Sequence, residues 1–192
     1  MSAPYLCTFA MAFVTLSCPA NAGADQSDAS GRYRIDPQAS HIGFTIDQIA
    51  GRGLSGAFER FSGTIQIEAG QISRSAVTID VVPASVSTGQ QRVDTFLRSN
   101  AVFDAEHEKQ IFFRSTSVKQ LDGSSALVVG QMTARGKTGM ETFTARLDSQ
   151  SRGKVIFQIT GKVLRSRYGM DVGTPIYSNV VDFDMKLTAN RQ

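Results

Sequence analysis

Apolar and polar residues alternate along most of this chain, which is the spacing of side chains on a strand with one buried face. The clearest case lies near the C-terminus, where apolar residues occupy every second position from Val181 to Leu187. The same period runs from Ile42 to Ile46 and from Val77 to Val81, and the pattern begins at Tyr33. Further strands are predicted over residues 53–59, 61–68, 110–118, 125–134, 140–148 and 154–165.

One segment, TGQQRVDTFLRSN at residues 88–100, breaks the alternation. Val93, Phe96 and Leu97 fall at helical spacing within it. Thr88 and Gln91 fit a capping box, in which a hydroxyl and an amide three residues apart satisfy free N–H groups of the first turn. The sequence therefore predicts a single short helix.

The predicted strands fit two architectures, a sandwich and a closed barrel. Closure removes exposed strand edges, and a barrel of about eight strands can enclose one small apolar ligand. The apolar phase slips by one residue between Phe58 and Phe61, so we interpret Glu59-Arg60 as a bulge or bend. We favour an all-β fold: an antiparallel β-barrel of about eight strands with one short helix.

The N-terminus has the pattern of a secretory signal peptide over residues 1–22. An apolar centre from Leu6 to Cys18 precedes Ala20-Asn21-Ala22, so cleavage is expected before Gly23. A membrane anchor is disfavoured because the apolar run is shorter than the roughly 20 residues that span a bilayer, and Leu16 disfavours lipidation at Cys18. We expect a flexible leader over residues 23–31, a barrel domain over residues 32–190, and a periplasmic or secreted location.

Charge and cysteine content narrow the chemistry further. The chain carries 20 Lys and Arg against 17 Asp and Glu, and the signs are interspersed. A nucleic-acid partner is not expected, because such proteins favour a basic stripe with stacking aromatics. Both cysteines, Cys7 and Cys18, lie in the predicted signal peptide, so the mature chain is expected to lack a disulfide and a thiolate.

The motifs that could carry catalysis or a metal are weak. FDAEHEK at residues 103–109 contains His107, one of only two histidines. Transition-metal sites usually recruit several His or Cys ligands, and the spacing lacks the EF-hand pattern for calcium. ARGKTG at residues 134–139 has Gln131 where a phosphate loop needs glycine, so a hairpin explains it better. We expect no metal site and no catalytic residue.

Phenylalanines are spread over many of the predicted strands. Core filling explains them individually, but together they could also line an elongated apolar cavity, with the helix as a cover. The candidate lining residues are Phe44, Phe58, Phe96, Leu97, Phe113, Phe143 and Phe157.

With these residues laid out, the chain resembles the YceI-like family of bacterial extracytoplasmic lipid-binding proteins. The resemblance runs from YRIDPQASHIGFTI to VVDFDMKLTA and is carried by GRGLSGAFERFSGTI, STGQQRVDTFLRSNAVFDAEHEKQIFFRS, GQMTARGKT and VLRSRYGM. Phe96 stands where members commonly have His, and Glu108-Lys109 replaces a frequent Tyr-Pro. The residues that match the family's motifs are Asp94, Leu97, Arg98 and Ser99 of the helix, and Arg165, Tyr168, Gly169 and Met170 before the last strand.

The resemblance implies a lipocalin-like barrel that holds a polyisoprenoid, an isoprenoid quinone or a fatty-acid-like amphiphile, with no catalytic machinery and no cofactor besides the lipid. Asp94, Arg165 and Tyr168 are then candidates for the headgroup or cavity mouth. FDAEHEK becomes a link in which Phe103 packs inward and Glu106, His107 and Glu108 face water. An enzyme acting on the same lipid through Asp94, Arg165 or His41, and a secreted stress or interaction protein with a filled barrel, are the alternatives. Transient membrane contact and a homodimer stay open.

Overall fold

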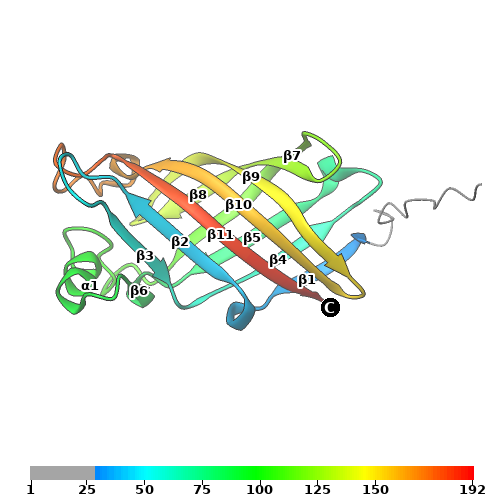
Figure 1. Ribbon diagram of the computed structural model, residues 1–192, viewed down its shortest axis with the longest axis horizontal. Coiled ribbons are helices and arrows are strands. Elements are labelled where there is room, and N and C mark those ends of the chain that lie inside the picture. Colours follow the sequence, from blue (N-terminus) through cyan, green and yellow to red (C-terminus); the bar gives the residue numbers. More distant parts are fainter. Residues whose placement is uncertain (1–28) are drawn as a thin grey trace, which may run out of the picture.

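The computed structural model describes residues 29–192, and within them the chain forms a β-barrel with one α-helix (Figure 1). The predicted signal peptide and residues 23–28 of the predicted leader lie outside the described residues. In residues 29–192 no helix is long and apolar enough to cross a membrane. The strands are β1 (Gly31–Ile35), β2 (His41–Ile46), β3 (Leu54–Phe58), β4 (Phe61–Ile67), β5 (Ala76–Val81), β6 (Val86–Ser87), β7 (Ile111–Gln120), β8 (Ser125–Ala134), β9 (Lys137–Ser151), β10 (Lys154–Leu164) and β11 (Val180–Arg191); the helix is α1 (Gln91–Arg98), and the 3-10 turns are η2 (Pro37–Ala39), η3 (Ile72–Arg74), η4 (Pro83–Ser85) and η5 (Arg165–Tyr168).

The strands form a closed antiparallel meander of eight strands. Three of them are bent, and each bent strand consists of two segments: β1 with β2, β3 with β4, and β5 with β6. Closure comes from β1, which pairs with β4 on one side and with β11 on the other, through Tyr33 opposite Arg191. The predicted barrel is therefore confirmed.

The bends have identifiable causes. Pro37 and Pro83 cannot donate to a strand ladder, and each opens the 3-10 turn that interrupts its strand. Glu59-Arg60 is the bend inferred from the phase slip, because β3 pairs with β2 and β6 whereas β4 pairs with β1 and β5. Ser85 secures this bend, since its Oγ accepts a hydrogen bond from Arg60 N at 2.9 Å.

The barrel begins earlier than the sequence indicated. Ala29 is buried and accepts a hydrogen bond from Tyr33 Oη at 2.9 Å. Ser30 Oγ accepts one from Ala69 N, and Gly31 already pairs with Ile67 in β1. Residues 29–31 therefore pack against the barrel, although they lie within the leader predicted over residues 23–31.

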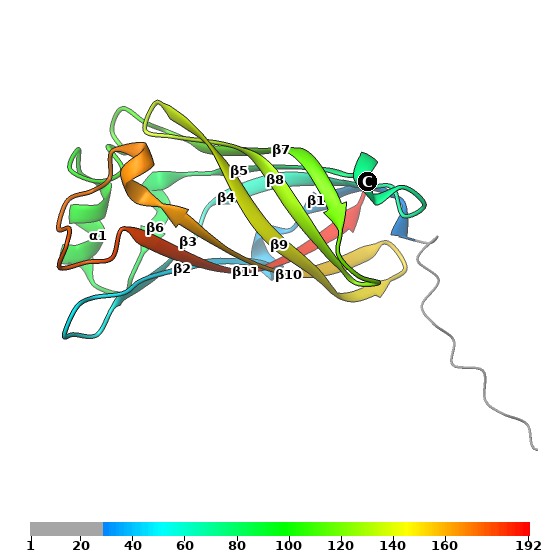
Figure 2. The same cartoon turned by 90° about the horizontal axis from the view of Figure 1, so that it is seen from above.

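The connections divide between two ends of the barrel (Figures 1 and 2). We call the end that carries α1 the helix end, and the end that carries the β7–β8 hairpin the hairpin end. The helix end holds residues 47–53, 88–110, 135–136 and 165–179; the hairpin end holds residues 68–75, 121–124 and 152–153.

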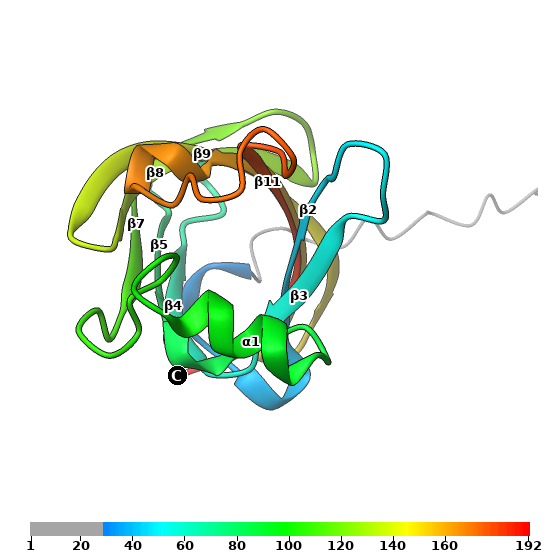
Figure 3. The ribbon, with the colours of Figure 1, turned by 90° about the vertical axis from the view of Figure 1, so that its left-hand side faces the viewer.

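Helix α1 lies at the rim of the helix end (Figure 3). The predicted capping box at Thr88 and Gln91 is wrong, because the N-cap is Gln90 and no side chain caps the first turn. The reason is that the Asp94 carboxylate takes the Thr88 hydroxyl instead, with hydrogen bonds from Thr88 N at 2.7 Å and Thr88 Oγ1 at 2.6 Å. This contact fastens the helix to the segment that precedes it.

Candidate functional site: an apolar cavity in the barrel

The interior of the barrel contains a cavity of about 250 Å³. Alternation turns every second residue of each strand inward, and the residues so placed are almost all apolar. The lining reaches from Leu97 at the helix end to Ile72 at the hairpin end. The cavity therefore has the shape and surface that suit an apolar chain rather than a polar small molecule.

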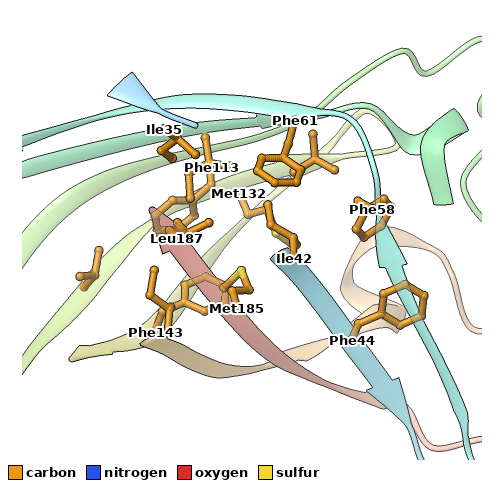
Figure 4. Close-up of a cluster of buried hydrophobic side chains, with 14 of the residues drawn as sticks. Ile35, Ile42, Phe44, Phe58, Phe61, Phe113, Met132, Phe143, Met185 and Leu187 are labelled. Atoms are coloured by element: carbon orange, nitrogen blue, oxygen red, sulfur yellow. The ribbon is translucent and has the colours of Figure 1, made fainter. Parts of the chain in front are cut away.

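Not all of the interior is hollow. Tyr33, Ile35, Leu187, Val155 and Ala189 are almost fully buried and pack together where β1, β10 and β11 meet. Ile35 and Leu187 belong to the same hydrophobic cluster as the lining residues Phe113 and Met132, all four of which Figure 4 labels, so this packed part adjoins the cavity wall. This solid core therefore lies toward the hairpin end, next to the β9–β10 connection at residues 152–153.

Phenylalanine rings form two clusters in the cavity wall. Near the helix end, Phe58 contacts Phe44 with ring centroids 5.5 Å apart and Phe103 at 5.6 Å. In the middle of the barrel, Phe143 contacts Phe113 at 5.3 Å and Phe183 at 6.2 Å, both edge to face. Such pairs hold the rings in fixed orientations, and Figure 4 shows that the labelled rings of the two clusters come from different strands.

Glycines make the room for these rings. A Cβ atom at Gly56 would lie 2.7 Å from Phe44 Cζ, and one at Gly130 would lie 2.5 Å from Phe113 Cζ. A Cβ at Gly161 would overlap the ring of Phe143 in the same way. Each ring is therefore seated over a neighbouring strand that has no side chain at that position.

Six of the seven predicted lining residues do line the cavity, and Phe96 does not. Its side chain is 48% exposed, whereas Leu97 is buried and lines the cavity. Adjacent helical residues point about 100° apart, so the orientation of α1 that buries Leu97 turns Phe96 to solvent. The six that line the cavity are Phe44, Phe58, Leu97, Phe113, Phe143 and Phe157; their contact with a ligand stays a prediction.

Arg165 lines the cavity at the helix end, but its hydrogen-bond donors are all bound to other residues of this chain. Its Nε donates to Ser178 O, one terminal nitrogen donates to Met170 O and Val172 O, and the other donates to Thr174 Oγ1 and Tyr177 O. A guanidinium has five N–H donors, and all five are used. Burial lowers the pKa of Arg165, opposed by the nearby Asp171 carboxylate. Arg165 therefore shapes the connection to β11 and has no donor left for a headgroup.

The other two candidate mouth residues lie outside the cavity lining. Asp94 is buried against Thr88, and the hydrogen bond from the Thr88 hydroxyl is the main cause that lowers its pKa. Tyr168 is fully buried and donates to Glu141 Oε1 at 2.7 Å, while Arg167 donates to the same oxygen. Burial and this carboxylate raise the pKa of Tyr168. The expected mouth at Asp94, Arg165 and Tyr168 is therefore a set of structural contacts that hold the helix end together.

The polar residues that do reach the cavity lie mainly at the hairpin end, and no sequence motif marks them. Gln66 and Ser75 contribute from the β4–β5 side, and Gln120, Asp122 and Ser124 contribute from the β7–β8 hairpin. Their residue types are those of ordinary turns and strand ends. Only the approach of the two connections in space identifies them.

The acidic stretch at residues 103–109 is a link between α1 and β7. Phe103 packs inward against Phe58, as predicted, and His107 and Glu106 are exposed, whereas Glu108 is half-buried. His107 Nδ1 lies 2.8 Å from Asp104 Oδ1, and this hydrogen bond raises the pKa of His107. Among residues 29–192, no group of three or more His, Cys, Asp and Glu side chains is placed to hold a metal ion.

A closed eight-stranded antiparallel barrel with an apolar interior and one short helix at its rim is a lipocalin-like barrel. Residues 33–190 match the family model described as the YceI-like domain. A UPF0312 protein of Serratia proteamaculans is 32% identical over 145 residues, which cover 72% of this chain and 75% of that protein. The chain belongs to the YceI-like family.

Solved structures share the fold. The crystal structure of BcnA from Burkholderia cenocepacia superposes with a TM-score of 0.76 at 21% identity and covers 81% of this chain and 99% of BcnA. A polyisoprenoid binding domain from Saccharophagus degradans, implicated in plant cell wall breakdown, gives a TM-score of 0.67 at 16% identity and covers 83% of this chain and 98% of that domain.

Proposed function

We propose that this protein is a periplasmic carrier that binds the chain of one long amphiphile inside its barrel. The ligand classes are a polyisoprenoid, an isoprenoid quinone and a fatty-acid-like lipid. The observation that carries the proposal is the continuous apolar cavity, which extends from Leu97 to Ile72. Each CH₂ group removed from water contributes about 0.8 kcal/mol, so such a cavity favours a chain over a compact ligand.

Two further observations support a binding role. A secreted stress or interaction protein with a side-chain-filled barrel is disfavoured because the interior keeps about 250 Å³ of open space. Membership of the YceI-like family and likeness in fold to a polyisoprenoid binding domain favour binding over catalysis on a lipid. The periplasmic location rests on the signal-peptide pattern of residues 1–22.

Exchange of the chain with a membrane is part of the proposal, because a free prenyl or acyl tail is insoluble in water. The contact with the membrane is proposed to be transient, and a homodimer stays a prediction. Neither is needed for the cavity, which is lined by one chain.

The test is a chain-length series on the purified protein. Long prenyl quinones and polyprenols should raise the free energy of unfolding by about 2.7 kcal/mol at a free concentration one hundred times the dissociation constant. Analogues with the same headgroup and a short tail should raise it much less, because they bury less chain. Native mass spectrometry followed by solvent extraction would identify any lipid that copurifies. Equal stabilisation by long and short analogues would contradict a binding site for the chain.

A further inference from the structure

We propose that the lipid enters and leaves the barrel sideways at the hairpin end, through a seam between the β4–β5 connection and the β7–β8 hairpin. The connection spans residues 68–75 and the hairpin spans residues 121–124. This inference rests on the proposed function, and it assigns the entrance to the end of the barrel opposite α1.

The seam exists because the pairing of β5 with β7 is short. It runs from Val81 opposite Ile111 to Thr78 opposite Arg114, whereas β7 continues to Gln120. The next contact is made by a side chain, since Val77 N donates to Ser115 Oγ at 2.9 Å. In the same place the pairing of β7 with β8 shifts register, and such irregularities bend a strand. From there the edge of β7 that faces β5 continues beside the 3-10 turn η3 rather than beside a strand, while the other edge stays paired with β8 as far as Gln120.

The cavity reaches the surface at this seam. Ala76 is exposed and yet lines the cavity, as do Ser124 and Asp122 across the seam. Ile72 of η3 is half-buried at the same place and packs against the core. The rim is polar and the interior is apolar, so a headgroup can stay in water at the rim while the chain lies inside.

Several connections at the helix end are joined by hydrogen bonds. Arg165 orders one of them, the connection to β11, with five hydrogen bonds inside it. Arg135 joins Asn100 O to Gly169 O, and Ile49 N donates to Ile176 O at 2.9 Å. The contacts of Arg135 and Ile49 link connections at the end of the barrel that faces the viewer in Figure 3. Passage of a chain at this end would require several of them to break.

The exposed large apolar residues do not favour the seam. Leu121, with 52% of its surface exposed, lies at the tip of the β7–β8 hairpin, whereas the other six in residues 29–192 lie at or next to the helix end: Ile49, Phe96, Met140, Leu164, Val172 and Ile176. By this criterion alone a membrane is met more readily at the helix end. The choice of the seam rests on the broken strand pairing and on the lining residues that reach the surface.

The test places a bulky group at one end or the other. In the full chain with Cys7→Ser and Cys18→Ser, single cysteines at Ser124→Cys and Phe96→Cys are each coupled to a large maleimide reagent. The ligand is a dansyl-labelled polyprenol delivered from phosphatidylcholine vesicles, and its association rate is measured. We expect the adduct at position 124 to slow association by about tenfold, and the adduct at position 96, which is also exposed, to leave it nearly unchanged.

A second pair of variants separates access from affinity. Ile72→Ala and Leu97→Ala each remove an apolar side chain from the lining, one at each end. Ile72→Ala should speed both association and dissociation, whereas Leu97→Ala should change dissociation alone. An entrance at the seam would be contradicted by slower association with the adduct at position 96 alone, by equal slowing with both adducts, or by slowing with neither. If the unlabelled parent retains no polyprenol, the proposed function itself has failed, which is a different result.

Discussion

At the scale of single residues, the cavity depends on where side chains are missing as much as on where they are present. Phe143 lies over Gly161, Phe113 over Gly130, and Phe44 over Gly56. A ring that packs over a glycine is fixed against the barrel wall and leaves the centre of the barrel free. The glycines therefore determine how much of the interior stays open.

Gly161→Ala should show this directly. The added methyl group overlaps the Phe143 ring, and overpacking of this kind costs about 1–3 kcal/mol of unfolding free energy. The ring must move toward the cavity, so retention of a long prenyl chain should fall as well. Gly70→Ala is the matched control, because a Cβ at that position meets nothing within 4 Å. Denaturant midpoints for the two variants check the prediction, and equal midpoints would contradict it.

Residue-level prediction from the sequence succeeded for the strands and only in part for the helix, where Leu97 lines the cavity and Phe96 does not. Period two determines which face of a strand is buried, so Phe44, Phe113 and Phe143 were placed correctly. On α1 both Phe96 and Leu97 fit the apolar spacing, and the choice between them depends on a rotation of the helix that its neighbours set. The five hydrogen bonds of Arg165 could not be predicted from the sequence either, because four of their acceptors are main-chain carbonyls.

At the scale of elements, three strands are bent and the helix is fastened by contacts of its side chains. The bends follow local chemistry, since Pro37 and Pro83 begin two of them. Asp94 of α1 accepts both the main-chain and the side-chain hydrogen bond of Thr88, and Arg98 donates to Val86 O at 2.7 Å. Asp94 has a place in a family motif, but this structural contact could not be assigned from the sequence.

Asp94→Asn should weaken the attachment of α1. It should also remove part of the pH dependence of hydrogen exchange at the α1 amides. The pKa of Asp94 is lowered in the folded protein from the ordinary value of 3.8, chiefly by the Thr88 hydroxyl. A lowered pKa means that the stabilisation is present above pH 3.8 and is lost as the pH falls through the folded value. Hydrogen exchange of the α1 amides should therefore rise below that pH in the parent, and should already be raised at neutral pH in Asp94→Asn.

Asp148→Asn, an exposed carboxylate on β9, is the control for that experiment. At neutral and at acid pH, hydrogen exchange of the α1 amides in this variant should equal that in the parent. Equal α1 protection in Asp94→Asn and in the parent at neutral pH would show that the carboxylate is not needed, and that packing of Leu97 and the hydrogen bond from Arg98 to Val86 O hold the helix.

At the scale of the whole molecule, closure joins residues that lie far apart in the chain. Tyr33 pairs with Arg191, and Ser40 bonds to Thr188 across the same junction. Local periodicity cannot report such contacts, so the barrel could be preferred over a sandwich only by argument and by family resemblance. The position of the proposed entrance is even harder to predict from the sequence, since it depends on β5 being too short to pair with the whole of β7.

The final prediction distinguishes a hollow barrel from a packed one. Phe157 is half-buried and lines the cavity, so a carboxylate at Phe157→Asp can hydrate when the cavity is empty but must be covered when a chain is bound. Covering an unpaired polar group costs about 1–3 kcal/mol, which corresponds to a loss of affinity of about tenfold to a hundredfold. Unfolding free energy without ligand should change by less than the binding free energy does.

Phe96→Asp is the matched control, because Phe96 is exposed at the helix end and does not line the cavity. It should change neither quantity appreciably. Melting temperature without ligand and retention of a prenyl quinone are measured for both variants and the parent. Loss of folding in Phe157→Asp before any loss of ligand would mean that the ring belongs to a packed core. In that case the cavity ends short of β10, and the chain must lie nearer to Phe113 and Phe143.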